Sequence, residues 1–413
     1  MQATLREWRD RLLGRGSAAI TVPVMDGALK PNRALDEAAV VAELAGLDDL
    51  ASDGRQLLVS AGTTLWRLDG ESLTEVRRFD AAIAALAVRP RSARPPTPAI
   101  AARSQARVAP AAQSSASRNP ASAPRNAGEG VDRAAIHPLP LAEGSGGGRI
   151  AIALAGQRVV VLDDSGAEIA RLDTLGAERL HSVNAVAFDG EDALLVSDGS
   201  LRFAPAQWCH DLMTRGRSGR VARWRFGSAA VDLLAQGQRY AFGVLALDGA
   251  VLHSESWNHR VVHTDARGAR PLLAELPGYP SRMSAAGDGG FWLTCFVCRT
   301  QLVEFVLRED AYRRRMVAEI DPRYWIAPAL SSGQSFLEPL QGAGVKQMGV
   351  LKPWAPPRSY GLVMKVAADG RIERSLHSLV DGRHHGITAV AEHDGALYVV
   401  SKGSGRLLKA SLS

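Results

Sequence analysis

Short runs in which apolar and polar residues alternate fill most of the chain, and many of them end at an Asp-Gly pair. Such pairs begin at positions 53, 189, 248, 288 and 394, and a second apolar run follows each within a few residues. Asp-Gly supplies the positive φ that tight hairpin turns need, and period-2 alternation is typical of strands. Each unit therefore predicts a strand, a tight turn, a second strand that ends in a small polar residue, and a third strand.

This unit is clear five times, and a sixth, degenerate copy fits residues 150–172, which lack the preceding turn phrase. Strand repeats of about 40 to 60 residues are typical of a propeller built from four-stranded blades. We therefore expect an all-β fold, a six-bladed β-propeller.

Three segments depart from the strand pattern. Residues 301–320 place apolar side chains at helical spacing among many charges, which predicts one helix that projects from a blade. Residues 5–13 read as a short amphipathic helix. Residues 90–148 are rich in Ala, Pro, Ser, Arg and Gly, and such a segment cannot bury enough apolar surface to offset the entropy of ordering it. We expect it to be a disordered insertion.

These segments give the expected domain organisation. An N-terminal helix and its lead-in occupy residues 1–39, and the first blade region follows at 40–89. The insertion at 90–148 lies between early blades, and the remaining blades fill 149–413.

The composition is that of a globular protein, with 46% hydrophobic and 22% charged residues. The formal charge of +6 arises in one region, because seven arginines and no acid lie between positions 89 and 128, which leaves the rest of the chain at −1. A basic domain is the usual sign of nucleic-acid binding. The charge distribution therefore argues against nucleic acid as a partner.

Three cysteines, Cys209, Cys295 and Cys298, are too few for a secreted disulfide scaffold. The chain has no run of the roughly 18 apolar residues that a membrane helix needs, and its first residues lack an apolar core of signal-peptide length. We expect a cytoplasmic monomer. Cys295 and Cys298 form a CxxC, but residues three apart on a strand face opposite ways, so we expect no shared metal.

The second half of the chain holds four distinctive phrases: VSDGSLRF at 196–203, ESWNHRV at 255–261, LPGYP at 276–280 before GGFW at 289–292, and EHDGALY at 392–398. Together they resemble the strictosidine synthase-like family over about residues 182–412. That family belongs to a six-bladed propeller group that includes paraoxonase-type and gluconolactonase-type hydrolases. The resemblance therefore implies the same number of blades as the repeats.

The resemblance also implies a calcium site at the centre of the propeller, where loops of several blades supply oxygen ligands. The implied positions fall on Asp48, Asn184, Phe242, Ser281 and Arg282. Asp48 and Asn184 are suitable ligands, whereas the other three replace ligands. A guanidinium repels Ca²⁺ and can itself satisfy a carboxylate. We expect no calcium and no other cofactor, with Arg282 as the central charge.

Strictosidine synthase itself joins an amine to an aldehyde and depends on a glutamate in its last blade. The position that matches this glutamate is Thr388. A threonine hydroxyl cannot deprotonate an ammonium near neutral pH. We therefore do not expect that reaction here.

Four further residues are candidates for chemistry or binding. His385 could place an imidazole at the central opening as a general base, or lie in an exposed loop. Glu255 matches a glutamate of the family's central cavity and could act as an acid, a base or the ion-pair partner of an arginine such as Arg282. Asp198 matches a family aspartate and could bind a ligand or satisfy turn amides. Trp257 follows in the same phrase as Glu255 and is a candidate ligand contact.

Two functions stay open. The first is a small-molecule hydrolase of the esterase or lactonase type, acting in the central cavity with Glu255, Arg282 and His385 as candidate catalytic residues. The second is a non-catalytic propeller that binds a small ligand or a protein and retains a degenerate calcium site. The replaced metal positions favour binding, and the charged residues that persist favour hydrolysis. The fold cannot decide between them, because a fold alone does not fix a function.

Overall fold

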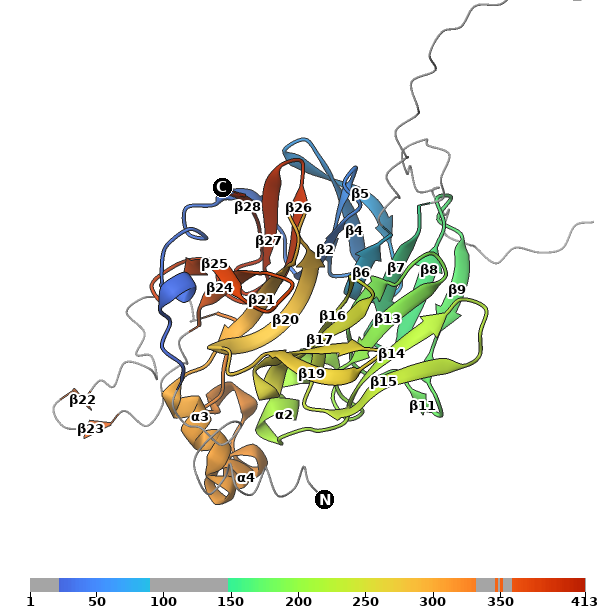
Figure 1. Cartoon of the computed structure of the whole chain (residues 1–413). Coiled ribbons are helices and arrows are strands. Elements are labelled where there is room, and N and C mark those ends of the chain that lie inside the picture. The colour runs from blue at the N-terminus through green and yellow to red at the C-terminus, as the bar shows by residue number, and fades with distance from the viewer. Residues whose placement is uncertain (1–21, 90–147, 332–345, 348–349, 352–358, 413) are drawn as a thin grey trace, which may run out of the picture. The chain divides into compact units, whose positions relative to one another are not determined.

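The computed structural model describes residues 22–89, 148–331 and 359–412, together with the backbone of 346–347 and 350–351. In this part of the chain the alternating runs form six antiparallel four-stranded sheets. The sheets are arranged as the blades of a propeller, which confirms the fold expected from the repeats (Figure 1).

Each blade begins at an inner strand and continues outward. The first three blades are β2 (Leu47–Ser52), β3 (Leu57–Ala61), β4 (Thr64–Asp69) and β5 (Ser72–Arg78); β6 (Ile83–Val88), β7 (Ile150–Leu154), β8 (Arg158–Leu162) and β9 (Glu168–Leu172); and β12 (Val183–Phe188), β13 (Ala193–Asp198), β14 (Gly219–Arg225) and β15 (Val231–Gln238). The other three are β16 (Ala241–Leu247), β17 (Ala250–Glu255), β18 (Arg260–Asp265) and β19 (Gly268–Leu273); β20 (Gly278–Ala285), β21 (Phe291–Cys298), β24 (Gly361–Val366) and β25 (Ile372–Ser378); and β26 (Ile387–His393), β27 (Ala396–Ser401), β28 (Arg406–Ser411) and β1 (Ala39–Glu43). Two short hairpins, β10 (Thr174–Leu175) with β11 (Glu178–Arg179) and β22 (Lys346–Gln347) with β23 (Val350–Leu351), lie outside the blades.

The inner strands close into a ring. β2, β6, β12, β16, β20 and β26 contact one another in that order, and β26 contacts β2 again. The ring is closed in sequence as well, because β1 pairs with β28 and so supplies the outer strand of the sixth blade. The region expected as the first blade, residues 40–89, therefore holds one whole blade, most of β1 from the sixth blade and the inner strand of the second.

The position of the insertion differs from the expectation. β6 ends at Val88 and pairs in register with β7, which begins at Ile150. The segment between them therefore interrupts the second blade after its inner strand, and the interpretation that it separates two blades is wrong. Residues 90–147 and the helix expected at 5–13 both lie outside the described residues.

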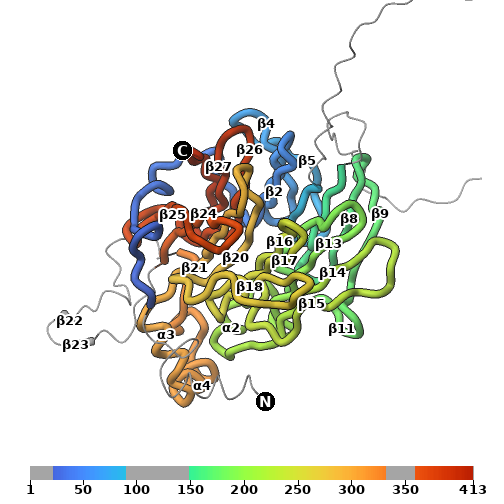
Figure 2. The backbone as a smooth tube through the Cα atoms, in the orientation of Figure 1, coloured from blue at the N-terminus to red at the C-terminus, as the bar shows by residue number. Residues whose placement is uncertain are grey.

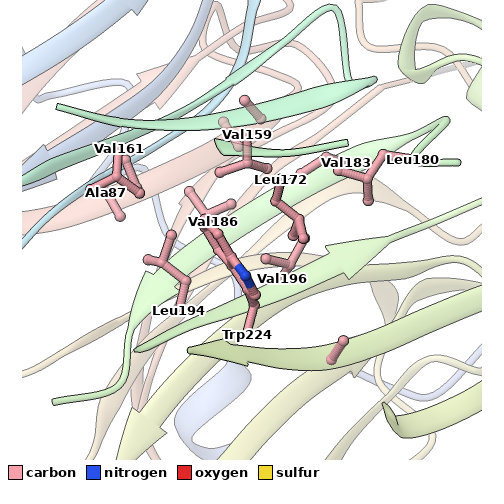
Figure 3. Close-up of a cluster of buried hydrophobic side chains, with 14 of the residues drawn as sticks. Ala87, Val159, Val161, Leu172, Leu180, Val183, Val186, Leu194, Val196 and Trp224 are labelled. Carbon is pink, nitrogen blue, oxygen red and sulfur yellow. The ribbon is translucent and has the colours of Figure 1, made fainter. Parts of the chain in front are cut away.

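Each interface between neighbouring blades has its own apolar cluster. Figure 3 shows the cluster between the second and third blades, where Val159 and Val161 of β8 meet Val186 of β12 and Trp224 of β14. The other five interfaces repeat this arrangement with separate clusters. Successive side chains of a strand face opposite neighbours, so the period-2 pattern buries both faces of each blade. A fully buried large side chain contributes about 1.5–3 kcal/mol, so these interfaces dominate the stability.

Three helices are inserted within blades, after the second strand of each: α2 (Trp208–Met213) between β13 and β14 of the third blade, and α3 (Gln301–Arg308) and α4 (Asp310–Glu319) between β21 and β24 of the fifth. The segment expected as one helix at 301–320 forms two, because Glu309 leaves the helical region with φ −77° and ψ 76°. Figure 2 shows the three helices close to one another, and α4 contacts both of the others. Four single 3₁₀ turns complete the described helical elements: η2 (Gly27–Leu29), η3 (Pro205–Gln207), η4 (Ser256–Asn258) and η5 (Pro322–Tyr324).

The CxxC lies on a strand as expected, but its geometry differs in one respect. β21 carries both Cys295 and Cys298, and both are free thiols. Opposite Tyr279 and Pro280 the register skips Phe296, so the strand has one extra residue between the cysteines. This bulge brings both thiols into one apolar cluster, and the expectation that they face opposite ways is wrong. In the part of the chain that the structure describes, no helix is long and apolar enough to cross a membrane.

Candidate functional site

The inner strands share a local irregularity that defines the centre of the propeller. Near the start of each one, its register with the second strand shifts, as in a β-bulge. A bulge turns a side chain away from the regular pleat, and bulges are frequent beside functional sites. The residues left between paired positions are Asp48, Ala84, Asn184, Phe242 with Gly243, Ser281 with Arg282, and Thr388. These include Thr388 and every position of the calcium site that the resemblance implies, but not Glu255.

Hydroxyl groups of the second strands stabilise the bulges. In three blades the hydroxyl accepts a hydrogen bond from an inner-strand N–H beside the bulge: Ser60 from Asp49 at 3.0 Å, Ser197 from Ala185 at 3.0 Å and Ser254 from Gly243 at 2.7 Å. In the fifth blade Thr294 donates instead to the carbonyl of Arg282 at 3.0 Å. In these four blades the small polar residue of the second strand therefore has a structural role beside the axis.

Arg282 extends from the fifth blade and contacts all of the other five. Its guanidinium is 6% exposed and donates to backbone carbonyls of four blades: from Nη1 to Asp48 at 3.0 Å and Thr388 at 3.5 Å, from Nη2 to Ala84 at 2.6 Å, and from Nε to Asn184 at 2.9 Å. The remaining blade supplies the Phe242 ring, whose centroid lies 5.3 Å from the guanidinium carbon in a cation–π contact.

Two adjacent carboxylates balance this cation. Asp48 Oδ1 lies 3.2 Å from Nη1 of Arg282, and Asp49 Oδ2 lies 3.1 Å from its Nε. Lys402, in the turn between β27 and β28, adds a second cation 2.7 Å from Asp48 Oδ2. The axis therefore holds two negative and two positive charges, which we name the axial cluster: Asp48, Asp49, Arg282 and Lys402.

The two carboxylates have different protonation behaviour. Burial raises the pKa of Asp48, but the charges of Lys402 and Arg282 outweigh burial and hold it below its usual value. Burial raises the pKa of Asp49 to about 7, because Arg282 offsets only part of the desolvation and Asp48 adds a like charge. Asp49 is 2% exposed and accepts the N–H groups of Leu50 at 2.9 Å and Leu86 at 2.8 Å. Asp49 therefore changes its protonation near neutral pH, whereas the pKa of Asp48 lies below the ordinary value of an aspartate.

The residues at the axis do not fit the calcium ion that the resemblance implies. A central ion would need oxygens of Asp48, to which the guanidinium of Arg282 already donates. The Asn184 side chain donates to the carbonyl of Ala241 at 2.9 Å, and Phe242 presents an aromatic ring in place of an oxygen. The described residues include no group of three or more His, Cys, Asp or Glu that could hold a metal. The chain thus places a fixed organic cation where its relatives are expected to place a divalent one.

A cavity of 230 Å³ lies next to the axial cluster. Arg282 and Asp49 lie at one end, and all six inner strands line the walls toward their carboxyl ends. Most lining side chains are Ala, Val and Leu, while Ser52, Ser284 and Glu392 add polar groups. Because each inner strand is paired on one side only, its other edge presents backbone N–H and C=O groups to the axis. The cavity therefore combines apolar walls with hydrogen-bonding groups and a charged end.

Three further candidates lie at the axis as structural partners. Asn184 and Thr388 offer their carbonyls to Arg282, and the Thr388 hydroxyl donates to the carbonyl of Asp48 at 2.6 Å. The Ser281 hydroxyl contacts Thr294 at 2.7 Å and donates to the carbonyl of Ile387 at 3.1 Å. These residues join neighbouring blades and position the arginine.

The structure places Glu255 and Trp257 in other surroundings. Glu255 is buried at the end of β17, where it pairs with Arg260 and accepts the N–H of Arg239 at 2.7 Å. Its ion-pair partner is therefore Arg260 and not Arg282. Trp257 donates to Asp211 at 2.8 Å and stacks on Tyr240, with ring centroids 4.4 Å apart.

Asp198 and His385 are also held by local contacts. Asp198 is fully buried, pairs with Arg220 and accepts the N–H of Ser182 at 2.7 Å, while burial raises its pKa. His385 is buried, and its ring contacts the Ser359 hydroxyl at 2.6 Å and the Leu379 carbonyl at 2.6 Å. Burial lowers the pKa of His385. In the described part of the chain, the hydrogen bonds and ion pairs of Asp198 and His385 link them to residues outside the axial cluster.

Two members of the axial cluster were not candidates from the sequence. Asp49 follows Asp48 directly, but only the bulge turns both carboxylates toward one arginine. Lys402 lies in an ordinary turn between the last two apolar runs, so nothing in its neighbourhood marks it. A signal for Asp49 does exist, since a carboxylate inside an otherwise apolar inner strand needs a partner when it is buried.

Comparison with known proteins supports the resemblance seen in the sequence, although no family model matches the chain. Adipocyte plasma membrane-associated protein of Salmo salar is 25% identical over 257 residues, which cover 58% of this chain and 54% of that protein. Protein STRICTOSIDINE SYNTHASE-LIKE 10 of Arabidopsis thaliana is 28% identical over 109 residues, 25% of this chain and 29% of that protein. The chain thus spans about half or less of the length of these curated relatives.

Among solved structures, a gluconolactonase of Xanthomonas campestris is similar over 95% of each chain, with a TM-score of 0.51 and 10% sequence identity. At this identity the likeness shows the fold alone. It confirms the six-bladed propeller fold, and the two sequence relatives support the strictosidine synthase-like resemblance.

Proposed function

We propose that this strictosidine synthase-like propeller is a small-molecule hydrolase of the ester or lactone type, acting in the axial cavity without a metal. The observation that carries the proposal is the meeting of Asp49 and Arg282 at the closed end of a cavity with largely apolar walls. Such a combination of an apolar pocket and a few convergent polar groups is typical of small-molecule sites. The resemblance to gluconolactonase-type propellers is a further, weaker support, because it rests on the fold.

The base in this proposal is the Asp49 carboxylate. It takes a proton from a water molecule while the water oxygen attacks the carbonyl carbon of the ester or lactone. The acyl C–O bond then breaks, and protonated Asp49 returns its proton to the leaving alkoxide. The carboxylic acid that forms loses its own proton to solvent, so a carboxylate and an alcohol result. A carboxylate with a pKa of about 7 is a far better base at neutral pH than an ordinary aspartate.

The electrophile in this proposal is Arg282. Nη2 carries two hydrogens, and among the described residues it donates one of them to the Ala84 carbonyl. The second hydrogen is the donor for the oxyanion that forms on the substrate. Asp48 and Lys402 do not contact the substrate here, because Asp48 is held between two cations. Their role is to fix the guanidinium and to keep its charge balanced.

A second candidate is binding in the same cavity without turnover. One observation favours it: Arg282 already donates to four backbone carbonyls and two carboxylates, which leaves little of its charge for a developing oxyanion. In this case the axial cluster only holds the blades together, and the cavity binds a small neutral molecule.

The test is a screen of small p-nitrophenyl esters and γ- and δ-lactones against the purified chain in the presence of EDTA. We expect turnover of at least one substrate, a loss of roughly 100-fold or more in Asp49→Asn, and an unchanged rate in the matched exposed control Asp192→Asn. Equal rates in Asp49→Asn and the wild type would overturn the assignment of the base. No turnover of any substrate, with a small molecule retained in native mass spectra, would establish the binding alternative.

A further inference from the structure

A second pocket lies away from the axis, between the end of α2, η4 and α3. Its volume is 50 Å³, and the residues that face it include Arg215, Arg239, Trp257, Glu304 and Arg308. Since a single water needs about 10–15 Å³ of such space, the pocket has room for a group of a few heavy atoms. Nothing in the proposed hydrolysis uses these residues.

The charges around this pocket are mostly positive toward the opening. Arg308 ends α3 and is exposed, and Arg215 has a loose contact of 3.6 Å with the half-exposed Asp310. Arg239 lies in the turn between β15 and β16 and adds a third guanidinium to the lining. Three arginines around one small pocket favour an anion, because each guanidinium presents several N–H donors in a fork that matches carboxylate and phosphate.

The acids of the same region are already engaged inside the protein. Glu304 is 3.1 and 3.3 Å from the guanidinium of Arg299 and accepts the Tyr279 hydroxyl at 3.0 Å. Asp211, behind the Trp257 indole, accepts hydrogen bonds from that indole and from Ser200 at 2.6 Å. Glu304, which also lines the pocket, is thus balanced by Arg299, and the three arginines outnumber this one acid of the lining.

The wall of the pocket is apolar and aromatic. The Trp257 indole faces it together with Leu212 and Leu307, while the other side of the indole stacks on Tyr240. His259 also faces the pocket, and burial together with the Arg299 charge holds its pKa well below the ordinary value. A neutral imidazole and an indole form a better contact surface for an organic group than for a bare inorganic ion.

Two residues that face the pocket have unusual backbone conformations. Arg215 has φ 58° and His259 has φ 49°, both in the left-handed region that non-glycine residues rarely occupy. Left-handed backbone at two non-glycine residues around one pocket is more typical of functional sites than of packing alone.

From these observations we propose that the pocket is a binding site for a small organic anion, a carboxylate or phosphate group attached to an apolar or aromatic body. The arginines Arg215, Arg239 and Arg308 bind the anionic group, and the body of the ligand rests against Trp257. The site is separate from the axial cavity and does not depend on hydrolysis there.

The test is calorimetric titration of the full chain with benzoate and with phenyl phosphate, which distinguishes the two head groups. The variants are Arg308→Gln and Arg239→Met, and the matched control is Arg314→Gln, an exposed arginine on α4 that does not face the pocket. We expect at least one probe to bind the wild type and Arg314→Gln equally, and to bind each pocket variant roughly five- to tenfold more weakly. Added salt should weaken binding in the wild type.

Three results would overturn the proposal. The first is the absence of binding by both probes at millimolar concentration. The second is an equal loss of affinity in Arg314→Gln and Arg308→Gln, which indicates unspecific attraction by surface charge. The third is unchanged affinity in both pocket variants. Because Arg308 is exposed, its replacement leaves the folding of the chain intact, and thermal unfolding of each variant verifies this.

Discussion

Replacing Arg282 by methionine keeps an unbranched apolar stem but removes the guanidinium, with its charge and all of its donors. Four carbonyls on four blades then lose their hydrogen bonds, and Asp48 and Asp49 lose their shared partner. Removing one partner of a buried ion pair costs about 3–5 kcal/mol, because the other charge stays buried without compensation. The open cavity lets water reach some of the freed groups, which keeps the loss within this range.

The expected fall in melting temperature follows from the size of the folded part. With about 2.1 cal/mol/K of unfolding entropy per residue over about 300 described residues, this loss lowers the Tm by roughly 5–8 °C. Arg282→Lys keeps the charge but has three donors instead of five, so we expect about half the loss. Adding Asp49→Asn to Arg282→Met should recover about 1–2 kcal/mol, because it removes the uncompensated carboxylate.

The assay is thermal and urea unfolding followed by tryptophan fluorescence and circular dichroism. The matched control is Arg315→Met, since Arg315 forms an exposed pair with Glu319 on α4 and its loss should cost less than about 0.5 kcal/mol. If Arg282→Met unfolds within 1 °C of Arg315→Met, the arginine does not hold the blades together, and the reasoning about the axis fails.

Three other predictions concern the same residues and their surroundings. The hydrolytic kcat/KM should rise with pH to a plateau above about pH 7, because the deprotonated form of Asp49 is the base and burial raises its pKa to about 7. A flat pH profile in the wild type, or the same profile in Asp49→Asn, would assign the proton transfer to another group. The double variant Phe242→Asn/Arg282→Asp returns oxygen donors to the axis, so calcium at a hundred times its Kd should stabilise it by about 2.7 kcal/mol. The measurement is a rise in Tm that EDTA reverses. No response to calcium would contradict the assignment of these positions to a former metal site. Asp198→Asn should lower the free energy of unfolding by about 3–5 kcal/mol, because Arg220 is left buried without its charged partner. Turnover per folded molecule should stay the same. A selective loss of turnover would give Asp198 the ligand-binding role considered from the sequence.

The fold could be predicted because the repeats carry their own physical signals. Asp-Gly turns and period-2 alternation mark the strands, and the small polar residue after each second run anticipates the hydroxyls of Ser60, Ser197 and Ser254 at the bulges. The degenerate copy at 150–172 was correctly included, although its inner strand β6 lies before the insertion. The closure of the sixth blade by β1 could not be predicted, because strand pairing between the two ends of a chain leaves no local pattern.

The candidate site was predicted in part. Arg282, Asp48, Asn184, Phe242 and Thr388 could be placed at the axis from the resemblance to a known family, and the structure shows that they occupy equivalent bulges of the inner strands. Asp49 could not be recognised, since its contact with Arg282 depends on a one-residue shift in register. Glu255 satisfies a different arginine from the one considered, because Arg260 pairs with it across the neighbouring strand. Ion pairs between strands depend on register, which residue types alone do not determine.

The central claim is that a guanidinium stands on the propeller axis in place of a divalent ion. Calcium content by elemental analysis of the purified chain, combined with calorimetric titration of the same sample with CaCl₂, tests it most directly. The account predicts far less than one calcium per chain, no heat of binding, and the same Tm in EDTA and in calcium. One tightly bound calcium per chain that is lost in Asp48→Ala would contradict it.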